Sequence, residues 1–126
     1  MEKEVIIAKK GIPPVGPYSP GIKIGNFLFV SGQGPLDPDT KKVPDDFKEQ
    51  VRVTLENIKG IVEAAGGSMD HIVKTIVFLK DMNNFNTMNR IYQKFFSRKP
   101  PARSCVEVAR LPLDIQVEIE AIAYIP

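Results

Sequence analysis

The stretch PARSCVEVARLP, residues 101–112, decides the fold together with the stretch VEIEAIA, residues 117–123. Apolar and polar residues alternate in both stretches, with the period of two that is typical of β-strands. Proline and aspartate between the two stretches favour a reversal of the chain, so we expect the strands to form an antiparallel pair. A register with Cys105 opposite Glu118 places Arg103, Cys105 and Glu118 together on the face that lacks the apolar stripe. Such a face is either solvated or a functional site.

Charged residues that alternate along an antiparallel sheet usually form its solvated face. Two features favour a functional site instead. Free cysteine is usually buried, which makes Cys105 an unusual choice for a wet face. Arg103 follows the sequence PPA, where the backbone is stiff, and a stiff backbone suits a positioned guanidinium. Two simpler interpretations of Glu118 stay open, an ion-pair partner of Arg103 and a solvated strand residue.

Composition limits the class of protein. A length of 126 residues fits one domain, which we expect to span residues 1–126. The apolar fraction of 43% is sufficient for a core, and no apolar run approaches the roughly 20 residues that cross a bilayer. No long apolar segment follows the N-terminus, so no secretory signal is expected. The single cysteine excludes an internal disulfide and fits a reducing compartment, so we predict a cytoplasmic protein.

Charge and potential metal ligands argue against two classes of function. The net charge is only +2, and the basic residues occur as scattered pairs rather than as a stripe. This distribution gives weak support for nucleic-acid binding as the main role. One histidine and one cysteine, far apart in the sequence, argue against a structural zinc site.

Periodicity and turn signals predict the element order βββαβαββ. Before the two C-terminal strands, the expected elements are strands at Glu4–Ala8, Ile22–Ile24, Phe27–Ser31 and Ile72–Leu79, and helices at Phe47–Ala65 and Phe85–Phe96. The pair Gly25-Asn26 predicts a tight hairpin turn. Asp46 and Glu49 predict a capping box at the start of the first helix, and the glycines at 66–67 predict its end.

The strand at 72–79 is apolar on both faces, which predicts cover on both sides. Two helices cover only one face of such a sheet. A second copy of the chain is the economical cover for the other face. We therefore predict a homo-oligomer with Cys105 and Arg103 near the interface.

The C-terminal stretches resemble the signature of the RidA/YjgF family, the reactive-intermediate deaminases. Four further motifs match in order, namely GPYSPGI (16–22), FVSGQGPLDP (29–38), VTLENIKGIVEAAGGS (53–68) and VKTIVFLKDMNNFNTMN (73–89). The resemblance therefore covers almost the whole chain. It implies an α+β fold of the chorismate-mutase-like type, a mixed β-sheet with two helices on one face. It also implies a homotrimer with clefts between the subunits.

The resemblance implies hydrolysis of 2-imino acids such as 2-iminobutanoate and 2-iminopropanoate to 2-oxo acids and ammonia. Pyridoxal-phosphate enzymes that act on threonine or serine would supply these substrates, and no cofactor or metal is expected. Carried over to this chain, Arg103 holds the substrate carboxylate and Glu118 activates water. The implied substrate-binding residues are Tyr18, Ser31, Gly32, Asn89 and Cys105.

These residue types suit the implied reaction. Arginine offers a rigid fork that binds a carboxylate through two hydrogen bonds, whereas lysine supplies only the charge. Hydrolysis then needs water to lose a proton during attack and nitrogen to gain one during departure. One carboxyl group, that of Glu118, is able to do both in sequence.

Simpler interpretations exist for the other residues of this set. Tyr18 in a loop rich in glycine and proline is typical of a packing anchor. Asn89 is also consistent with a helix-surface residue, and Cys105 beside an arginine with a reactive thiol. Pro20 and Gly34 depart from the pattern common in the family. Gly34 affects the packing of the loop around the implied cleft, so the substrate preference stays open.

Two alternative functions are kept beside the deaminase. Some members of the family are described as ribonucleases or translation inhibitors, and the near-neutral charge argues against this role here. The other alternative is a non-catalytic module that binds a carboxylate metabolite. Arg103 is consistent with either the deaminase or the binding module.

Overall fold

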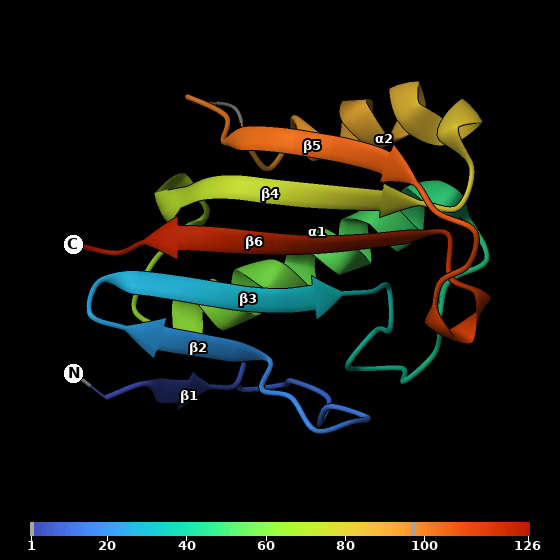
Figure 1. The fold of residues 1–126 in the computed structure, drawn as a ribbon. Coiled ribbons are helices and arrows are strands. Elements are labelled where there is room, and N and C mark those ends of the chain that lie inside the picture. Colours follow the sequence, from blue (N-terminus) through green and yellow to red (C-terminus); the bar gives the residue numbers. More distant parts are fainter. Residues whose placement is uncertain (1, 97) are drawn as a thin grey trace.

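The fold is a six-stranded sheet with two helices packed on one of its faces (Figure 1). A computed structural model describes residues 2–96 and 98–126. The elements are β1 (Glu4–Ile6), β2 (Gly21–Ile24), β3 (Phe27–Gln33), α1 (Phe47–Ala64), β4 (Ile72–Leu79), α2 (Phe85–Tyr92), β5 (Ala102–Glu107) and β6 (Val117–Tyr124). Three short 3₁₀ helices lie at Met69–His71, Met82–Asn84 and Pro112–Asp114. The predicted order βββαβαββ and the α+β class are confirmed.

The sheet is mixed, and its strand order is β1-β2-β3-β6-β4-β5. The predicted antiparallel pairing of the two C-terminal strands is wrong, because β4 lies between them. Val77 of β4 pairs with Cys105 of the parallel strand β5 and with Ile119 of the antiparallel strand β6. A strand that is apolar on both faces gains most from a central position. The nine residues between β5 and β6 easily span the two strand spacings, about 10 Å, that separate them.

Helix α1 begins and ends at the residues that its capping signals indicate. The carboxylate of Asp46 accepts a hydrogen bond from the backbone N–H of Glu49 at 3.2 Å. Glu49 does not complete the predicted capping box, because its own carboxylate accepts a hydrogen bond from Arg52 at 2.7 Å. Gly66 follows the helix with a φ of +89°, a conformation that favours glycine. The predicted start and end are therefore confirmed, and the cap consists of the Asp46 hydrogen bond without the reciprocal bond from Glu49.

Helix α2 ends at Tyr92, four residues before the predicted end at Phe96. Beyond it, the backbone N–H groups of Lys94 and Phe95 donate to carbonyls three residues earlier, at 3.1 and 3.0 Å. These bonds are typical of 3₁₀ turns rather than of an α-helix. The apolar periodicity continues through this segment, and Phe96 is buried. The periodicity thus predicted the burial correctly and the helix type incorrectly.

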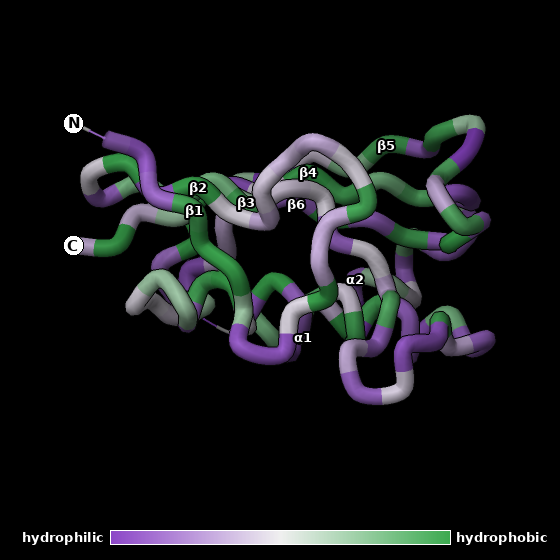
Figure 2. The backbone as a smooth tube through the Cα atoms, turned by 90° about the horizontal axis from the view of Figure 1, so that it is seen from below, coloured by the Kyte–Doolittle hydropathy of each residue, from purple (hydrophilic) through white to green (hydrophobic). Residues whose placement is uncertain are grey.

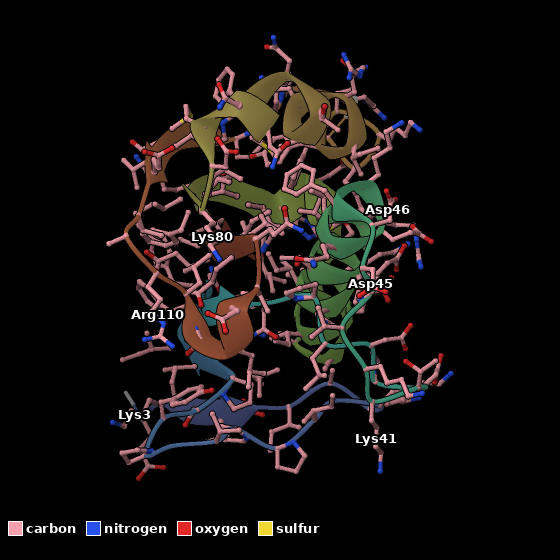
Figure 3. All side chains as sticks on the ribbon, turned by 90° about the vertical axis from the view of Figure 1, so that its right-hand side faces the viewer. Lys3, Lys41, Asp45, Asp46, Lys80 and Arg110 are labelled. Carbon is pink, nitrogen blue, oxygen red and sulfur yellow. The ribbon has the colours of Figure 1, made fainter. Side chains whose placement is uncertain are left out.

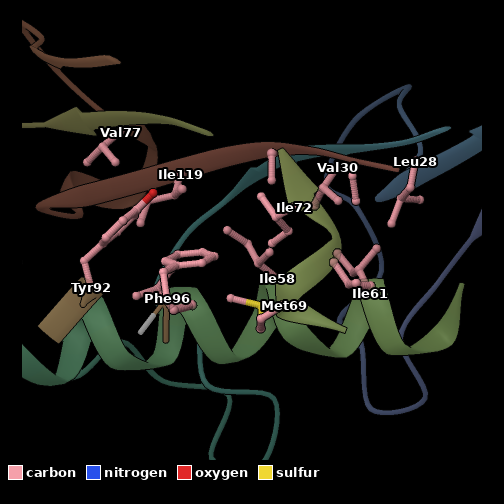
Figure 4. Close-up of a cluster of buried hydrophobic side chains, with 14 of the residues drawn as sticks. Leu28, Val30, Ile58, Ile61, Met69, Ile72, Val77, Tyr92, Phe96 and Ile119 are labelled. Carbon is pink, nitrogen blue, oxygen red and sulfur yellow. The ribbon is translucent and has the colours of Figure 1, made fainter. Parts of the chain in front are cut away.

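The core lies between the helices and the inner face of the sheet. Ile58 and Ile61 of α1 lie below Leu28 and Val30 of β3 and Ile119 of β6 (Figure 4). Residues along β6 alternate between buried and partly exposed, as the period of a strand requires. The outward-facing positions of β6 include both of its glutamates.

The opposite face of the sheet carries no helix (Figure 2). Large exposed apolar side chains gather on it, namely Val5, Ile24, Phe27, Phe29, Val106 and Tyr124. The ring of Phe27 lies 5.1 Å from that of Tyr124 in an edge-to-face contact. An exposed apolar face of this kind usually marks an interface. The expected open face is confirmed, and its cover by a second copy stays a prediction.

Among the described residues, no helix is long and apolar enough to cross a membrane.

Candidate active site

The guanidinium of Arg103 is held by helix α2 at the edge of the sheet. Its Nη1 donates a hydrogen bond to Oδ1 of Asn89 at 2.8 Å. Its central carbon lies 4.8 Å from the centre of the Tyr92 ring and 5.5 Å from that of Phe85. Within the described residues, the other guanidinium nitrogens make no hydrogen bond and Arg103 forms no salt bridge. The arginine is thus fixed on one side and free to bind an anion on the other.

Cys105 lies two residues beyond Arg103 on the same face of β5. Burial raises the pKa of its thiol, and the charge of Arg103 acts in the opposite direction as the smaller effect. The thiol is therefore protonated at neutral pH, and a protonated thiol is a poor nucleophile. We call Asn89, Arg103 and Cys105 the arginine half-site.

Glu118 lies on the open face of the sheet, beside Phe78 of β4. Burial raises the pKa of its carboxyl group, and the charge of Glu120 raises it further. The carboxylate packs against the backbone of Gly32, where a Cβ would lie only 2.5 Å from Oε2 of Glu118. The glycine thus provides the space that this carboxylate occupies.

Ser31 connects the loop that carries Tyr18 to strand β3. Its hydroxyl donates to the carbonyl of Ser19 at 2.6 Å, and its backbone N–H donates to the carbonyl of Pro20 at 2.9 Å. Tyr18 is 49% exposed, so its ring is available to a ligand or to a partner rather than serving as a buried anchor. We call Tyr18, Ser31, Gly32 and Glu118 the glutamate half-site.

The two half-sites lie on opposite faces of the sheet, so the predicted shared face of Arg103, Cys105 and Glu118 is wrong. Thr75 of β4, which pairs with Arg103, is fully buried under the helices. Phe78, which pairs with Glu118, lies three residues further along β4 and hence on the other face. An ion pair between Arg103 and Glu118 within one chain is excluded for the same reason.

The error has a physical cause in strand β5. Its most apolar residue, Val106, lies on the open face and is 43% exposed. The face with Arg103 and Cys105 packs on α2 instead, because aromatic rings and the thioether of Met88 accommodate a guanidinium. The apolar face of the edge strand β5 therefore points away from the core.

Comparison with known proteins identifies the family. The family model described as "Endoribonuclease L-PSP" matches residues 8–125. The chain belongs to the RidA/YjgF family.

Relatives in this family include a RutC family protein of Pyrococcus abyssi, 53% identical over 125 residues that cover 98% of each chain. The protein named 2-iminobutanoate/2-iminopropanoate deaminase in Escherichia coli is 52% identical over 121 residues, 93% of this chain and 94% of its own. The crystal structure of the E. coli YjgF gene product superposes with a TM-score of 0.93 at 48% identity, over 96% of this chain and 98% of the other. That of E. coli TdcF with bound serine gives 0.94 at 44% identity, over 98% and 99%.

Three residues that contact the arginine half-site were missed by the sequence analysis as functional candidates. They are Phe85 and Tyr92, which lie within the predicted second helix, and Thr75 of the predicted strand at 72–79. A signal for them was present, because Phe85 and Tyr92 lie four residues before and three residues after Asn89. This spacing places Phe85, Asn89 and Tyr92 on one face of a helix. No comparable signal in the sequence indicated Thr75.

Proposed function

We propose that the chain hydrolyses small 2-imino acids, such as 2-iminobutanoate and 2-iminopropanoate, to 2-oxo acids and ammonia. The observation that carries this proposal is the guanidinium of Arg103, which Asn89 and two aromatic rings hold while its other nitrogens bond to none of the described residues. Such a fork fits a carboxylate through two hydrogen bonds. The name of the E. coli relative supports the same reaction.

In this proposal, Arg103 fixes the carboxylate and thereby the adjacent imine carbon, and holding the reacting carbon in place supplies much of the rate. The imine reacts in its protonated form, so the addition of water to this carbon, while Glu118 takes one proton of the water, gives a neutral carbinolamine. Glu118 then returns the proton to nitrogen, and the carbon–nitrogen bond breaks as the hydroxyl oxygen forms the carbonyl. The hydroxyl proton leaves with the nitrogen as ammonium. The raised pKa of Glu118 supports this role, because a carboxylate of higher pKa is a stronger base.

We further propose that one site combines the arginine half-site of one chain with the glutamate half-site of another. Both half-sites are required at one substrate, and in a single chain the sheet separates them. Strand β5 lies at the edge of the sheet, where a neighbouring chain has access to it. The apolar open face supplies a surface for the second copy. The assembly that we propose is the chorismate-mutase-like homotrimer, located in the cytoplasm beside pyridoxal-phosphate enzymes that release 2-imino acids.

The test couples purified threonine dehydratase to this protein and follows the release of 2-oxobutanoate, with semicarbazide as a competing trap for the imine. The protein is expected to raise the fraction of imine that escapes the trap, and Arg103→Ala to abolish this effect. Arg110→Ala is the matched control, because Arg110 is exposed and its one salt bridge among residues 2–96 and 98–126 is with Asp114. No change in the fraction with the wild-type protein refutes the proposed reaction.

The second candidate is the ribonuclease activity that the description of the family model names. Lys3, Lys41, Lys80 and Arg110 lie apart from one another on the side of the molecule drawn in Figure 3. A nucleic-acid site usually gathers its basic residues into a stripe. RNA cleavage that survives Arg103→Ala would support this candidate against the deaminase.

A further inference from the structure

A buried pair of hydroxyl groups lies directly behind Arg103. The hydroxyl of Tyr92 on α2 and that of Thr75 on β4 are 2.7 Å apart. Thr75 is 0% exposed and Tyr92 is 6% exposed. A hydrogen bond between two buried groups is kept, because breaking it leaves both groups without water as a replacement partner. The pair therefore joins helix α2 to β4, the strand next to the edge strand β5.

Thr75 is also the residue that pairs with Arg103 in the parallel ladder between β4 and β5. The ring of Tyr92 is thus attached at both ends, to helix α2 through its backbone and to the neighbour of Arg103 through its hydroxyl. Its face lies 4.8 Å from the central guanidinium carbon. The ring supports the face of the guanidinium, while Asn89 fixes one of its nitrogens.

The chemistry of the tyrosine agrees with a supporting role. Burial raises the pKa of Tyr92, against smaller opposite effects of Thr75 and Arg103. The hydroxyl is therefore neutral at physiological pH. A neutral phenol ring attracts a cation through its π face and does not neutralise it as a carboxylate would. The charge of Arg103 thus stays available for a ligand.

We propose that Tyr92 and Thr75 are positioning residues, whose hydrogen bond fixes the Tyr92 ring and thereby the plane in which Arg103 presents its free N–H groups to a carboxylate. The inference rests on the proposed function, in which Arg103 holds the substrate carboxylate. It extends that function from the residues that contact substrate to two that act through Arg103. The proposed ligand chemistry is a planar 2-oxo or 2-imino carboxylate.

The test measures the dissociation constant of 2-oxobutanoate, a stable product analogue of the imine, by isothermal titration calorimetry. Tyr92→Leu removes the ring and is expected to weaken binding by about 5- to 30-fold. Tyr92→Phe keeps the ring but not the hydrogen bond and is expected to weaken binding by only about 2- to 5-fold. Thr54→Val is the matched control, because it removes a buried hydroxyl on α1 that has no hydrogen-bond partner among the described residues, and it is expected to bind as the wild type does.

The double variant of Thr75→Val with Tyr92→Phe guards against a loss of folding, because it removes both hydroxyls and leaves neither unpaired. It is expected to melt near the wild-type temperature and to bind as weakly as Tyr92→Phe. Binding at wild-type strength in this variant and in Tyr92→Leu overturns the inference. If Tyr92→Leu does not fold, the double variant decides alone.

A second readout is independent of ligand binding. The NMR resonance of the Arg103 Nε–H group, assigned by its absence in Arg103→Lys, is expected to show a ring-current displacement. Tyr92→Leu is expected to reduce this displacement to the contribution of the more distant Phe85 ring, and Tyr92→Phe to keep most of it. A wild-type protein that shows the ring-current displacement but neither binds 2-oxobutanoate nor hydrolyses the imine refutes the proposed function and leaves the support of Arg103 by Tyr92 in place. A wild-type protein that hydrolyses the imine, with an Arg103 resonance unaffected by Tyr92→Leu, refutes the positioning role alone.

Discussion

The substitution Gly32→Ala tests whether the position of the Glu118 carboxylate matters for the reaction. The added Cβ would lie 2.5 Å from Oε2, 2.8 Å from Cδ and 3.2 Å from Cγ of Glu118. An ordinary contact begins at 3.4 Å, so the oxygen must move by about 0.9 Å. Gly32 has no positive φ, so alanine fits the backbone and the clash falls on one flexible side chain. The fold is therefore expected to survive while the carboxylate is displaced.

A displacement of about 1 Å in a catalytic group costs on the order of 100-fold in rate. Gly32→Ala is thus expected to lower kcat/KM for imine hydrolysis by about 100-fold, with little change in melting temperature, in the coupled assay with semicarbazide. Gly34→Ala is the matched control, because its Cβ would meet only the end of the Ile115 side chain, at 2.8 Å. Wild-type activity in Gly32→Ala would refute the assignment of Glu118 as the group that activates water.

Three further substitutions test the two half-sites. Arg103→Lys keeps the charge and loses the fork, so kcat/KM is expected to fall by about 10- to 100-fold in the same assay; an unchanged value would show that charge alone suffices. Glu120→Gln removes a charge that raises the pKa of Glu118, so the acid limb of the pH–rate profile is expected to move to lower pH. An acid limb at the wild-type pH would contradict the assignment of Glu118 as the base. A carboxyl group whose pKa is raised by folding stabilises the folded state below its ordinary pKa of 4.5, where the group is protonated. This stabilisation is lost as the pH rises through the raised pKa of the folded state. Glu118→Gln is therefore expected to raise the melting temperature at neutral pH and to lose this advantage below pH 4.5, whereas a lowered melting temperature at neutral pH would contradict the burial of the charge.

Local signals in the sequence predicted the elements well. Asp46 marks the start of α1 and the glycines at 66–67 mark its end, because capping interactions act over only a few residues. The pair Gly25-Asn26 closes the predicted hairpin, and Gly25 has the positive φ that a two-residue turn requires. Such features depend on neighbours in the chain, so sequence is sufficient to find them.

These local signals do not determine the order of the strands in the sheet. The link between β5 and β6 permits a direct hairpin as well as a crossing of β4, and the tertiary packing of β4 between β5 and β6 decides between them. The same choice determines which face of β5 turns inward. The residues of the candidate site were therefore predicted by type, whereas the division of Arg103 and Glu118 between two faces required the structure.

The central claim is that two copies of the chain share each site, and mixed oligomers test it most directly. Arg103→Ala and Glu118→Gln are each expected to be inactive alone in the dehydratase assay. Unfolded together in equal amounts and refolded, they are expected to recover about one quarter of the wild-type activity, because about one site in four combines an intact arginine half-site with an intact glutamate half-site. A mixture that stays inactive, while wild-type protein treated in the same way regains its activity, would contradict the shared site.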